Sequence, residues 1–225
     1  GVPPVQNSCT DHLLEGRLRR MAAVDTETFS HIRRMQDKRF PTEVACILPG
    51  EFFVSREPMV VYTVLGSCIS ACIRDPIAGV GGMNHFMLPA PKEHQSGDAW
   101  GGESTRYGSF AMEQLINEIL KRGGMKHRLE VKLFGAGRIY EGNIDVGARN
   151  TEWVLHFLKN EGYAIAKSDL GDVYPRKVYY FTDSGRVLMK KIERVKNRTI
   201  VERETEYQHR IEVEPATPQD NITLF

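Results

Sequence analysis

A cysteine and a histidine are the residues whose types and spacing best fit chemistry. Cys68 ends the segment Leu65-Gly-Ser-Cys68, and His85 follows 17 positions later, framed by apolar residues. A thiol that is protonated at neutral pH is a poor nucleophile, so it needs a nearby imidazole or backbone N–H groups to stabilise the thiolate. The pair fits a nucleophilic thiol with a histidine base. The other interpretation is a small buried cysteine and a hydrogen-bonded core histidine.

The glycine before Cys68 favours a sharp turn at the end of a strand. Such a turn would present Cys68 with free backbone amides around it, and amides of this kind can hold the oxyanion of a tetrahedral intermediate. We therefore take Gly66 and Ser67, together with Asn84 beside the histidine, as candidates for binding the substrate or its oxyanion.

The sequence after Cys68 leaves its local structure open. Apolar residues alternate over 69–73, which favours a strand, whereas a helix would place Cys72 one turn after Cys68. Cys72 is assigned to core packing. A metal site made of Cys68, Cys72 and His85 is a weaker alternative, because zinc sites usually contain closer CxxC or HxxxH pairs and a fourth ligand. Phosphate-binding and dinucleotide-binding glycine motifs are also missing, so we predict neither a metal nor a cofactor.

Strand and helix patterns between about residues 44 and 188 must position this pair. Two amphipathic helices are expected, each with one apolar stripe and a glycine after its end, over residues 108–122 and 147–160. Strands are expected over residues 60–65, 80–88, 129–133, 178–182 and 186–195, the last two as a hairpin.

The two ends of the chain are polar. We divide the sequence into an N-terminal segment 1–42, a domain 43–199 and a charged C-terminal tail 200–225. The first segment is either a mobile tail or contains a short helix over residues 26–35. The last segment is expected to be solvated, because its charges are mixed and it ends in Pro215-Ala-Thr-Pro218.

The composition excludes several classes of protein. Lys and Arg number 30 against 29 Asp and Glu, a net charge of +1, so there is no electrostatic footprint for nucleic acid. The sequence lacks a long apolar run and a secretory signal, which predicts a cytoplasmic protein without membrane insertion. Four cysteines in 225 residues are too few for a disulfide scaffold.

Several motifs together resemble the CheD family of chemoreceptor glutamine deamidases. The resemblance covers about residues 45–195. It rests on Leu65-Gly-Ser-Cys68, Ile69-Ser-Ala-Cys-Ile-Arg-Asp-Pro76, Gly81-Gly-Met-Asn-His-Phe-Met-Leu-Pro89, Arg106-Tyr-Gly108, Phe134-Gly-Ala-Gly137 and Asn143-Ile-Asp-Val-Gly-Ala-Arg-Asn150. It implies an α/β fold, a layered sandwich of β-sheets with flanking helices, as a single domain with polar tails.

The resemblance also implies an activity and its residues. The chain would be a cysteine amidohydrolase, a protein-glutamine glutaminase that converts receptor glutamines to glutamates, with Cys68 as nucleophile and His85 as base. The family's third residue is a threonine six positions before the cysteine, where this chain has Tyr62, so the role passes to Thr63. The implied partners are the cytoplasmic helices of chemoreceptors and, in some bacteria, a CheC-type phosphatase. The alternatives are a non-catalytic chemotaxis binding module and a thiol methylesterase.

Overall fold

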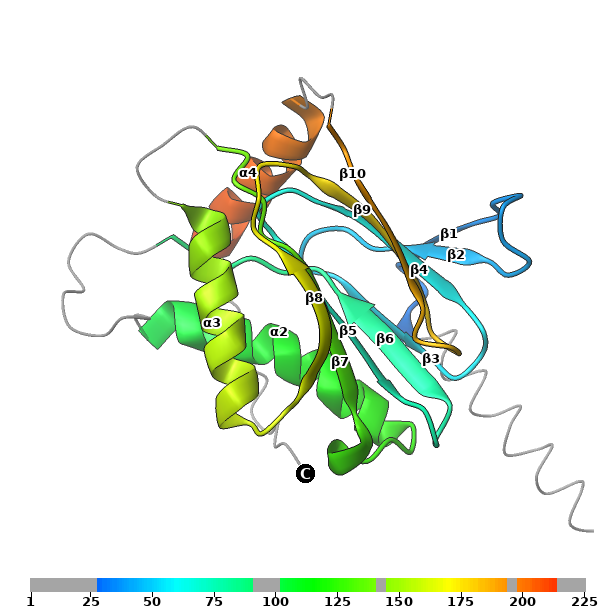
Figure 1. Cartoon of the computed structure of the whole chain (residues 1–225). Helices are drawn as coiled ribbons and strands as arrows, with labels where there is room; N and C mark the ends of the chain where they lie inside the picture. The colour runs from blue at the N-terminus through cyan, green and yellow to red at the C-terminus, as the bar shows by residue number, and fades with distance from the viewer. Residues whose placement is uncertain (1–27, 91–101, 141–144, 194–197, 214–225) are drawn as a thin grey trace, which may run out of the picture. The chain divides into compact units, whose positions relative to one another are not determined.

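The computed structural model describes residues 28–90, 102–140, 145–193 and 198–213 (Figure 1). The chain divides into two units, Gly1–Ile32 and Arg33–Phe225, and the second contains the sheets and helices. In the described part of the first unit, the backbone N–H of Ile32 donates to the carbonyl of Phe29.

Two five-stranded sheets form the framework of the second unit. The first sheet has the order β1 (Arg33–Met35), β2 (Val44–Cys46), β4 (Val60–Leu65), β9 (Arg176–Phe181) and β10 (Val187–Lys191). The second has the order β3 (Phe52–Ser55), β6 (Val80–Asn84), β5 (Ile69–Asp75), β7 (Glu130–Gly135) and β8 (Ile165–Leu170). Neighbouring strands are antiparallel except β2 with β4 and β7 with β8.

Helices cover one face of the second sheet, and the first sheet contacts it as well. Helix α2 (Gly102–Lys121) packs on β3, β5 and β6, α3 (Val146–Asn160) packs on β5, and strand β9 of the first sheet contacts β6 and β7 (Figure 1). The middle strands β5 and β6 are therefore buried at nearly every position rather than at alternate ones. This arrangement confirms the predicted α/β layered sandwich. A short 3₁₀ helix (Lys126–Arg128) leads into β7, and the last helix is α4 (Arg198–Val213).

Two glycines allow β6 to approach its neighbours closely. A Cβ atom on Gly81 would lie 2.7 Å from the carbonyl oxygen of Thr182, next to β9, and one on Gly82 would lie 2.5 Å from that of Phe53 on β3. Both distances are shorter than real contacts, so side chains at these positions would push the strands apart. This glycine pair is what lets the strand pack between its neighbours.

Most of the predicted elements are present, with changed ends. The strand at 60–65 is confirmed, and the one expected over 129–133 is present as Glu130–Gly135. The hairpin and the second helix are confirmed, and the stretch after Cys68 is a strand. The strand expected over 80–88 ends at Asn84. The first helix begins six residues early, at Gly102, and runs through Gly108. A Cβ on Gly108 would lie 2.6 Å from the Trp153 ring, so this glycine serves close helix packing and does not begin the helix.

The predictions for the terminal segments need correction. Arg33–Met35 form the edge strand β1, neither a helix nor a tail, because backbone pairing with β2 requires no apolar stripe. Residues 1–27 lie outside the described residues. The tail predicted to be solvated contains α4, which buries Glu204, Tyr207 and Ile211 on one face at helical spacing. The surrounding charges concealed this face in the sequence.

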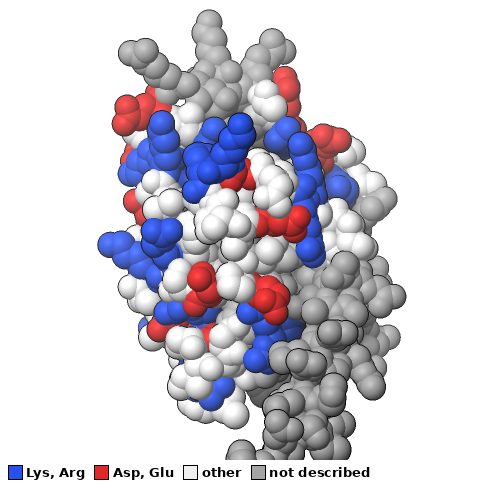
Figure 2. Space-filling model, turned by 90° about the vertical axis from the view of Figure 1, so that its right-hand side faces the viewer, with Lys and Arg blue, Asp and Glu red and all other residues white. Residues whose placement is uncertain are grey.

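Acidic and basic side chains lie next to one another on the face shown in Figure 2, in line with the nearly balanced charge. Among the described residues, no helix has the length and apolar character needed to cross a bilayer.

Candidate active site

Cys68 lies where the chain crosses from one sheet to the other. Strand β4 belongs to the first sheet and β5 to the second, so residues 66–68 form the turn between them. The turn is tightly enclosed, since a Cβ on Gly66 would lie 2.3 Å from a methyl carbon of Ile139. The predicted sharp turn at Gly66 is present, and Cys68 is fully buried behind it.

Hydrogen bonds fix all three carbonyl groups of this turn. The carbonyl of Gly66 accepts from the backbone N–H of Gly137 (2.7 Å), and that of Cys68 accepts from the N–H of Ala136 (2.8 Å). The middle one accepts from the side-chain amide of Asn150 (2.9 Å), whose own oxygen accepts from the N–H of Leu88 (2.9 Å). With these carbonyls engaged, the N–H groups of residues 66–68 are left to a different partner.

Glycines in Phe134-Gly-Ala-Gly137 make this bonding possible. Gly135 has a φ of 117°, and a Cβ there would lie 2.1 Å from the carbonyl oxygen of Cys68. A Cβ on Gly137 would lie 3.0 Å from the carbonyl oxygen of Gly66. Only residues without side chains fit this close to the turn, so the motif positions the thiol rather than binding a nucleotide.

The three N–H groups of the turn converge on the carboxylate of Glu204 from α4. The N–H groups of Gly66 and Cys68 donate to Oε1 at 2.7 and 3.3 Å. The N–H and hydroxyl groups of Ser67 donate to Oε2 at 2.8 and 2.6 Å. We call these donors of Gly66, Ser67 and Cys68 the amide cradle. It is built to hold a negatively charged oxygen.

His85 is oriented by Thr63 on β4. The Thr63 hydroxyl lies 2.8 Å from Nδ1 of His85 and donates its single proton to the carbonyl of Ile47, also at 2.8 Å. Since a hydroxyl has only one proton, Thr63 must accept from His85, which places the ring proton on Nδ1. Nε2 then carries a lone pair, and it is buried with no hydrogen-bond partner among the described residues.

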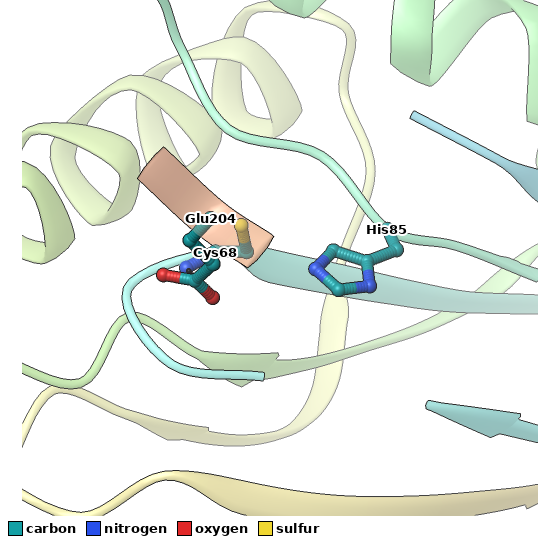
Figure 3. A group of neighbouring side chains, drawn as sticks. All are labelled: Cys68, His85 and Glu204. Atoms are coloured by element: carbon teal, nitrogen blue, oxygen red, sulfur yellow. Dashed lines mark hydrogen bonds between the residues drawn. The ribbon is translucent and has the colours of Figure 1, made fainter. Parts of the chain in front are cut away.

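The thiol, the imidazole and the Glu204 carboxylate form one buried cluster. Cys68 Sγ, a ring nitrogen of His85 and an oxygen of Glu204 all lie within 4.8 Å of one another, and Figure 3 shows the imidazole edge turned toward the other two residues. Burial lowers the pKa of His85 to about 3. Burial, and next the Glu204 carboxylate, raise the pKa of the Cys68 thiol well above its usual value. The resting pair is a neutral thiol beside a neutral imidazole.

The structure brings together five of the six residues predicted from the sequence. Thr63, Gly66, Ser67, Cys68 and His85 lie around one point. The contact with His85 favours Thr63 over Tyr62, whose ring stacks on Tyr179 instead, 4.7 Å between centroids.

Asn84 does not join this cluster. Its Oδ1 accepts from the N–H of Ala71 (2.8 Å), and its Nδ2 donates to the carbonyl of Ala111 (3.0 Å), which ties β6 to β5 and α2. These contacts do not support the oxyanion role predicted for Asn84, because its side-chain oxygen and nitrogen are bonded to the backbone of Ala71 and Ala111.

Two residues of the site carried little or no signal in the sequence. Glu204 lies in a segment that reads as a charged tail, and only the spacing of Tyr207 and Ile211 after it hints at a buried face. Asn150 sits at the start of an amphipathic helix, where a cap is the simpler interpretation. Both are buried and bonded to the turn that carries the thiol.

A metal ion would find sulfur, nitrogen and oxygen donors in Cys68, His85 and Glu204. The carboxylate, however, already accepts at both oxygens from the amide cradle. Partial positive charge on all sides suits an anion and not a cation. The donor set fits a thiol reaction centre better than a metal centre.

A buried thiol, an imidazole and converging backbone amides are typical of hydrolases that use a cysteine and a histidine, with backbone amides for the oxyanion. Comparison with known proteins is more specific. A family model described as "CheD chemotactic sensory transduction" matches residues 87–191. The chain belongs to the CheD family.

The relatives are similar over nearly the whole chain. The "Probable chemoreceptor glutamine deamidase CheD" of Halorhodospira halophila is 49% identical over 200 residues, covering 88% of this chain and 91% of the relative. "Probable chemoreceptor glutamine deamidase CheD 1" of Dechloromonas aromatica is 50% identical over 195 residues, covering 85% and 94%. The "Probable chemoreceptor glutamine deamidase CheD" of Herminiimonas arsenicoxydans is 49% identical over 178 residues, covering 78% of this chain and 87% of the relative.

Proposed function

We propose that this chain is a chemoreceptor glutamine deamidase that converts glutamine side chains on the receptor's cytoplasmic helices to glutamates. The observation that carries the proposal is the buried pair of Cys68 and His85 next to an amide cradle that holds a side-chain carboxylate. The names of the relatives support the choice of substrate.

The first half of the reaction forms a thioester. Nε2 of His85 accepts the proton of Cys68, and the sulfur attacks the side-chain carbonyl carbon of the glutamine. The amide cradle holds the oxygen that becomes negative. The carbon–nitrogen bond then breaks, and the nitrogen takes the proton from His85 and leaves as ammonia.

The second half restores the enzyme. Nε2 of His85 takes a proton from a water molecule, which attacks the thioester carbon while the amide cradle again holds the oxygen. The carbon–sulfur bond breaks, the sulfur recovers its proton, and a glutamate remains on the substrate. Glutamine and water are converted to glutamate and ammonium, because the released ammonia takes up the proton of the new carboxyl group, so every atom is accounted for by these two reactants and two side chains.

A neutral imidazole and a neutral thiol in the resting site suit these proposed reaction steps. A His85 whose pKa is about 3 is unprotonated at neutral pH and free to act as a base. A Cys68 thiol whose pKa is raised stays protonated until a substrate is in position. Proton transfer and attack on the carbon then occur together at the bound amide.

The glutamate product predicts an effect on receptor signalling. Each turnover replaces a neutral amide by a carboxylate and so adds negative charge to a receptor helix, which can shift the balance between signalling states. Because the proposed substrate lies on cytoplasmic helices, we expect this chain to act in the cytoplasm. Binding of a CheC-type phosphatase stays a prediction.

Release of ammonia from a receptor cytoplasmic fragment tests the proposal. We expect release by the wild-type chain and none by Cys68→Ala. Cys72→Ala is the matched control. Like Cys68, Cys72 is a buried thiol, but it lies on β5 and outside the cluster formed by the thiol, the imidazole and the Glu204 carboxylate. Binding of the fragment without turnover would favour a binding module, and faster hydrolysis of a protein methyl ester than of the amide would favour a methylesterase.

A further inference from the structure

Helix α4 places a glutamate where the proposed reaction leaves one. Glu204 is 1% exposed, and its carboxylate is held by the amide cradle and by no Lys or Arg ion pair within the described residues. A buried carboxylate is costly unless its oxygens are hydrogen-bonded. Both of its oxygens are bonded here, so the cradle matches this group closely.

One face of α4 docks on the site. After Glu204, the buried positions of the helix are Tyr207 and Ile211, one and two turns further on, while Glu206 is exposed. The hydroxyl of Tyr207 bonds that of Tyr107 on α2. The helix is therefore held across the thiol by a glutamate and by an aromatic residue three positions later.

The segment Pro49-Gly50 packs against the Tyr207 ring and leaves no room for a side chain at Gly50. A Cβ on Gly50 would lie 2.9 Å from the Tyr207 ring, and the guanidinium of Arg210 donates to the carbonyl of Pro49 (3.3 Å). The segment that contacts α4 here also fixes the histidine, since the N–H of Gly50 donates to the carbonyl of His85 (2.8 Å). The contact with α4 and the position of His85 thus depend on the same loop.

We infer that the amide cradle is the subsite for the substrate's side chain and that α4 occupies it as a product-like helix of the same chain, with residue 204 in the place of the modified residue. This inference rests on the proposed function. It specifies the substrate further: a helix that carries a glutamine and, three positions later, a side chain that fits between Gly50 and Tyr107. Such a helix must displace α4 to react.

A substitution converts the surrogate into a substrate. In Glu204→Gln, the Cys68 sulfur can attack the carboxamide carbon of the introduced glutamine, ammonia leaves with the proton from His85, and water releases the thioester as a glutamate. The products are ammonia and a glutamate at position 204, the residue that the wild-type chain has there. The variant protein should therefore revert to the wild-type sequence at this one position.

Mass spectrometry of the purified full-length variant reads this out. Chymotrypsin cleaves after Tyr207, which separates residue 204 from Gln208, a glutamine on the same helix that serves as internal control. We expect a glutamate at position 204 in Glu204→Gln and an intact glutamine there in the double variant Glu204→Gln/Cys68→Ala. Gln208 should stay unmodified in both proteins.

Alkylation of Cys68 by iodoacetamide measures occupancy without activity. The carboxylate of Glu204 is one cause of the raised pKa of Cys68. Removing it in Glu204→Ala uncovers the thiol and lowers its pKa, and each unit raises the thiolate fraction about tenfold. We expect alkylation to be at least ~10-fold faster in Glu204→Ala than in the wild type or in Glu206→Ala, the matched exposed control.

The outcomes separate the two proposals. If the glutamine of the Glu204→Gln variant persists and alkylation is unchanged while the receptor fragment is deamidated, the placement of α4 is wrong and the proposed function stands. If neither that introduced glutamine nor the fragment reacts while alkylation still rises in Glu204→Ala, the activity is wrong and α4 does occupy the thiol site. If the introduced glutamine and the receptor fragment both stay unmodified and alkylation is also unchanged, both proposals are overturned.

Discussion

Replacing Thr63 by valine tests how the site orients its base. The substitution keeps the shape of the side chain but removes the oxygen that accepts from Nδ1 of His85 at 2.8 Å. A buried N–H without a partner costs about 1–3 kcal/mol. If this cost falls on the reactive arrangement of His85, the rate falls about 5- to 160-fold, since 1.36 kcal/mol corresponds to tenfold.

Steady-state deamidation of a receptor cytoplasmic fragment is the assay. In the proposed mechanism Thr63 acts only through His85, to which its hydroxyl is bonded, so Thr63→Val should lower kcat and leave KM unchanged. Thr63→Ser retains the hydroxyl and should recover most of the rate. Tyr62→Phe, at the position that the family pattern favours, should behave like the wild type because the Tyr62 ring stacks on Tyr179. A folded Thr63→Val protein with wild-type kcat, or a Thr63→Ser protein as slow as Thr63→Val, would refute this reasoning.

Three further predictions concern the framework of the site. His85 has a pKa of about 3 in the folded chain against 6.5 ordinarily, so the unfolded chain binds the extra proton between these values. The unfolding free energy therefore decreases as the pH falls below 6.5, by up to about 1.4 kcal/mol per pH unit. Urea titrations at several pH values should show a smaller decrease for His85→Gln than for the wild type. An equal pH dependence in the two proteins would contradict the lowered pKa of His85. Asn150→Ala removes two hydrogen bonds of a fully buried amide, and we expect a loss of about 1–3 kcal/mol in unfolding free energy together with a lower kcat; unchanged values for both would show that Asn150 does not hold the turn. Gly135→Ala should be far more destabilising than Gly162→Ala in thermal melts, because both glycines have positive φ but only Gly135 lacks room for a Cβ; equal losses would mean that backbone strain alone decides.

The sequence was most informative where residue type and local geometry agree. Cys68 after Gly66, and a histidine framed by apolar residues, were sufficient to single out this pair, with a small buried cysteine and a core histidine as the alternative; the catalytic roles came from the family resemblance. Their positions follow from the chain crossing between sheets at that glycine. The two long helices were predictable because their apolar stripes pack directly on the second sheet.

What the sequence concealed depends on contacts between distant segments. Glu204 is buried because amides 136 to 138 positions earlier in the chain bind it, and nothing near Glu204 shows this. Edge strand β1 is held by backbone pairing that any residues can make. Asn84 was chosen only because it precedes His85, and its contacts with Ala71 and Ala111 depend on how β6 packs on β5 and α2. The misplaced start of α2 came from a glycine that serves helix packing.

Mass spectrometry of a receptor cytoplasmic fragment, incubated with this chain in water enriched in heavy oxygen, follows the proposed deamidation at the reacting atoms. Specific glutamines should become glutamates carrying one heavy oxygen atom, because water cleaves the thioester on Cys68. The conversion should be absent with Cys68→Ala and present with Cys72→Ala. Unmodified glutamines with the wild-type chain, or equal conversion by Cys68→Ala, would show that the Cys68 thiol does not deamidate the receptor.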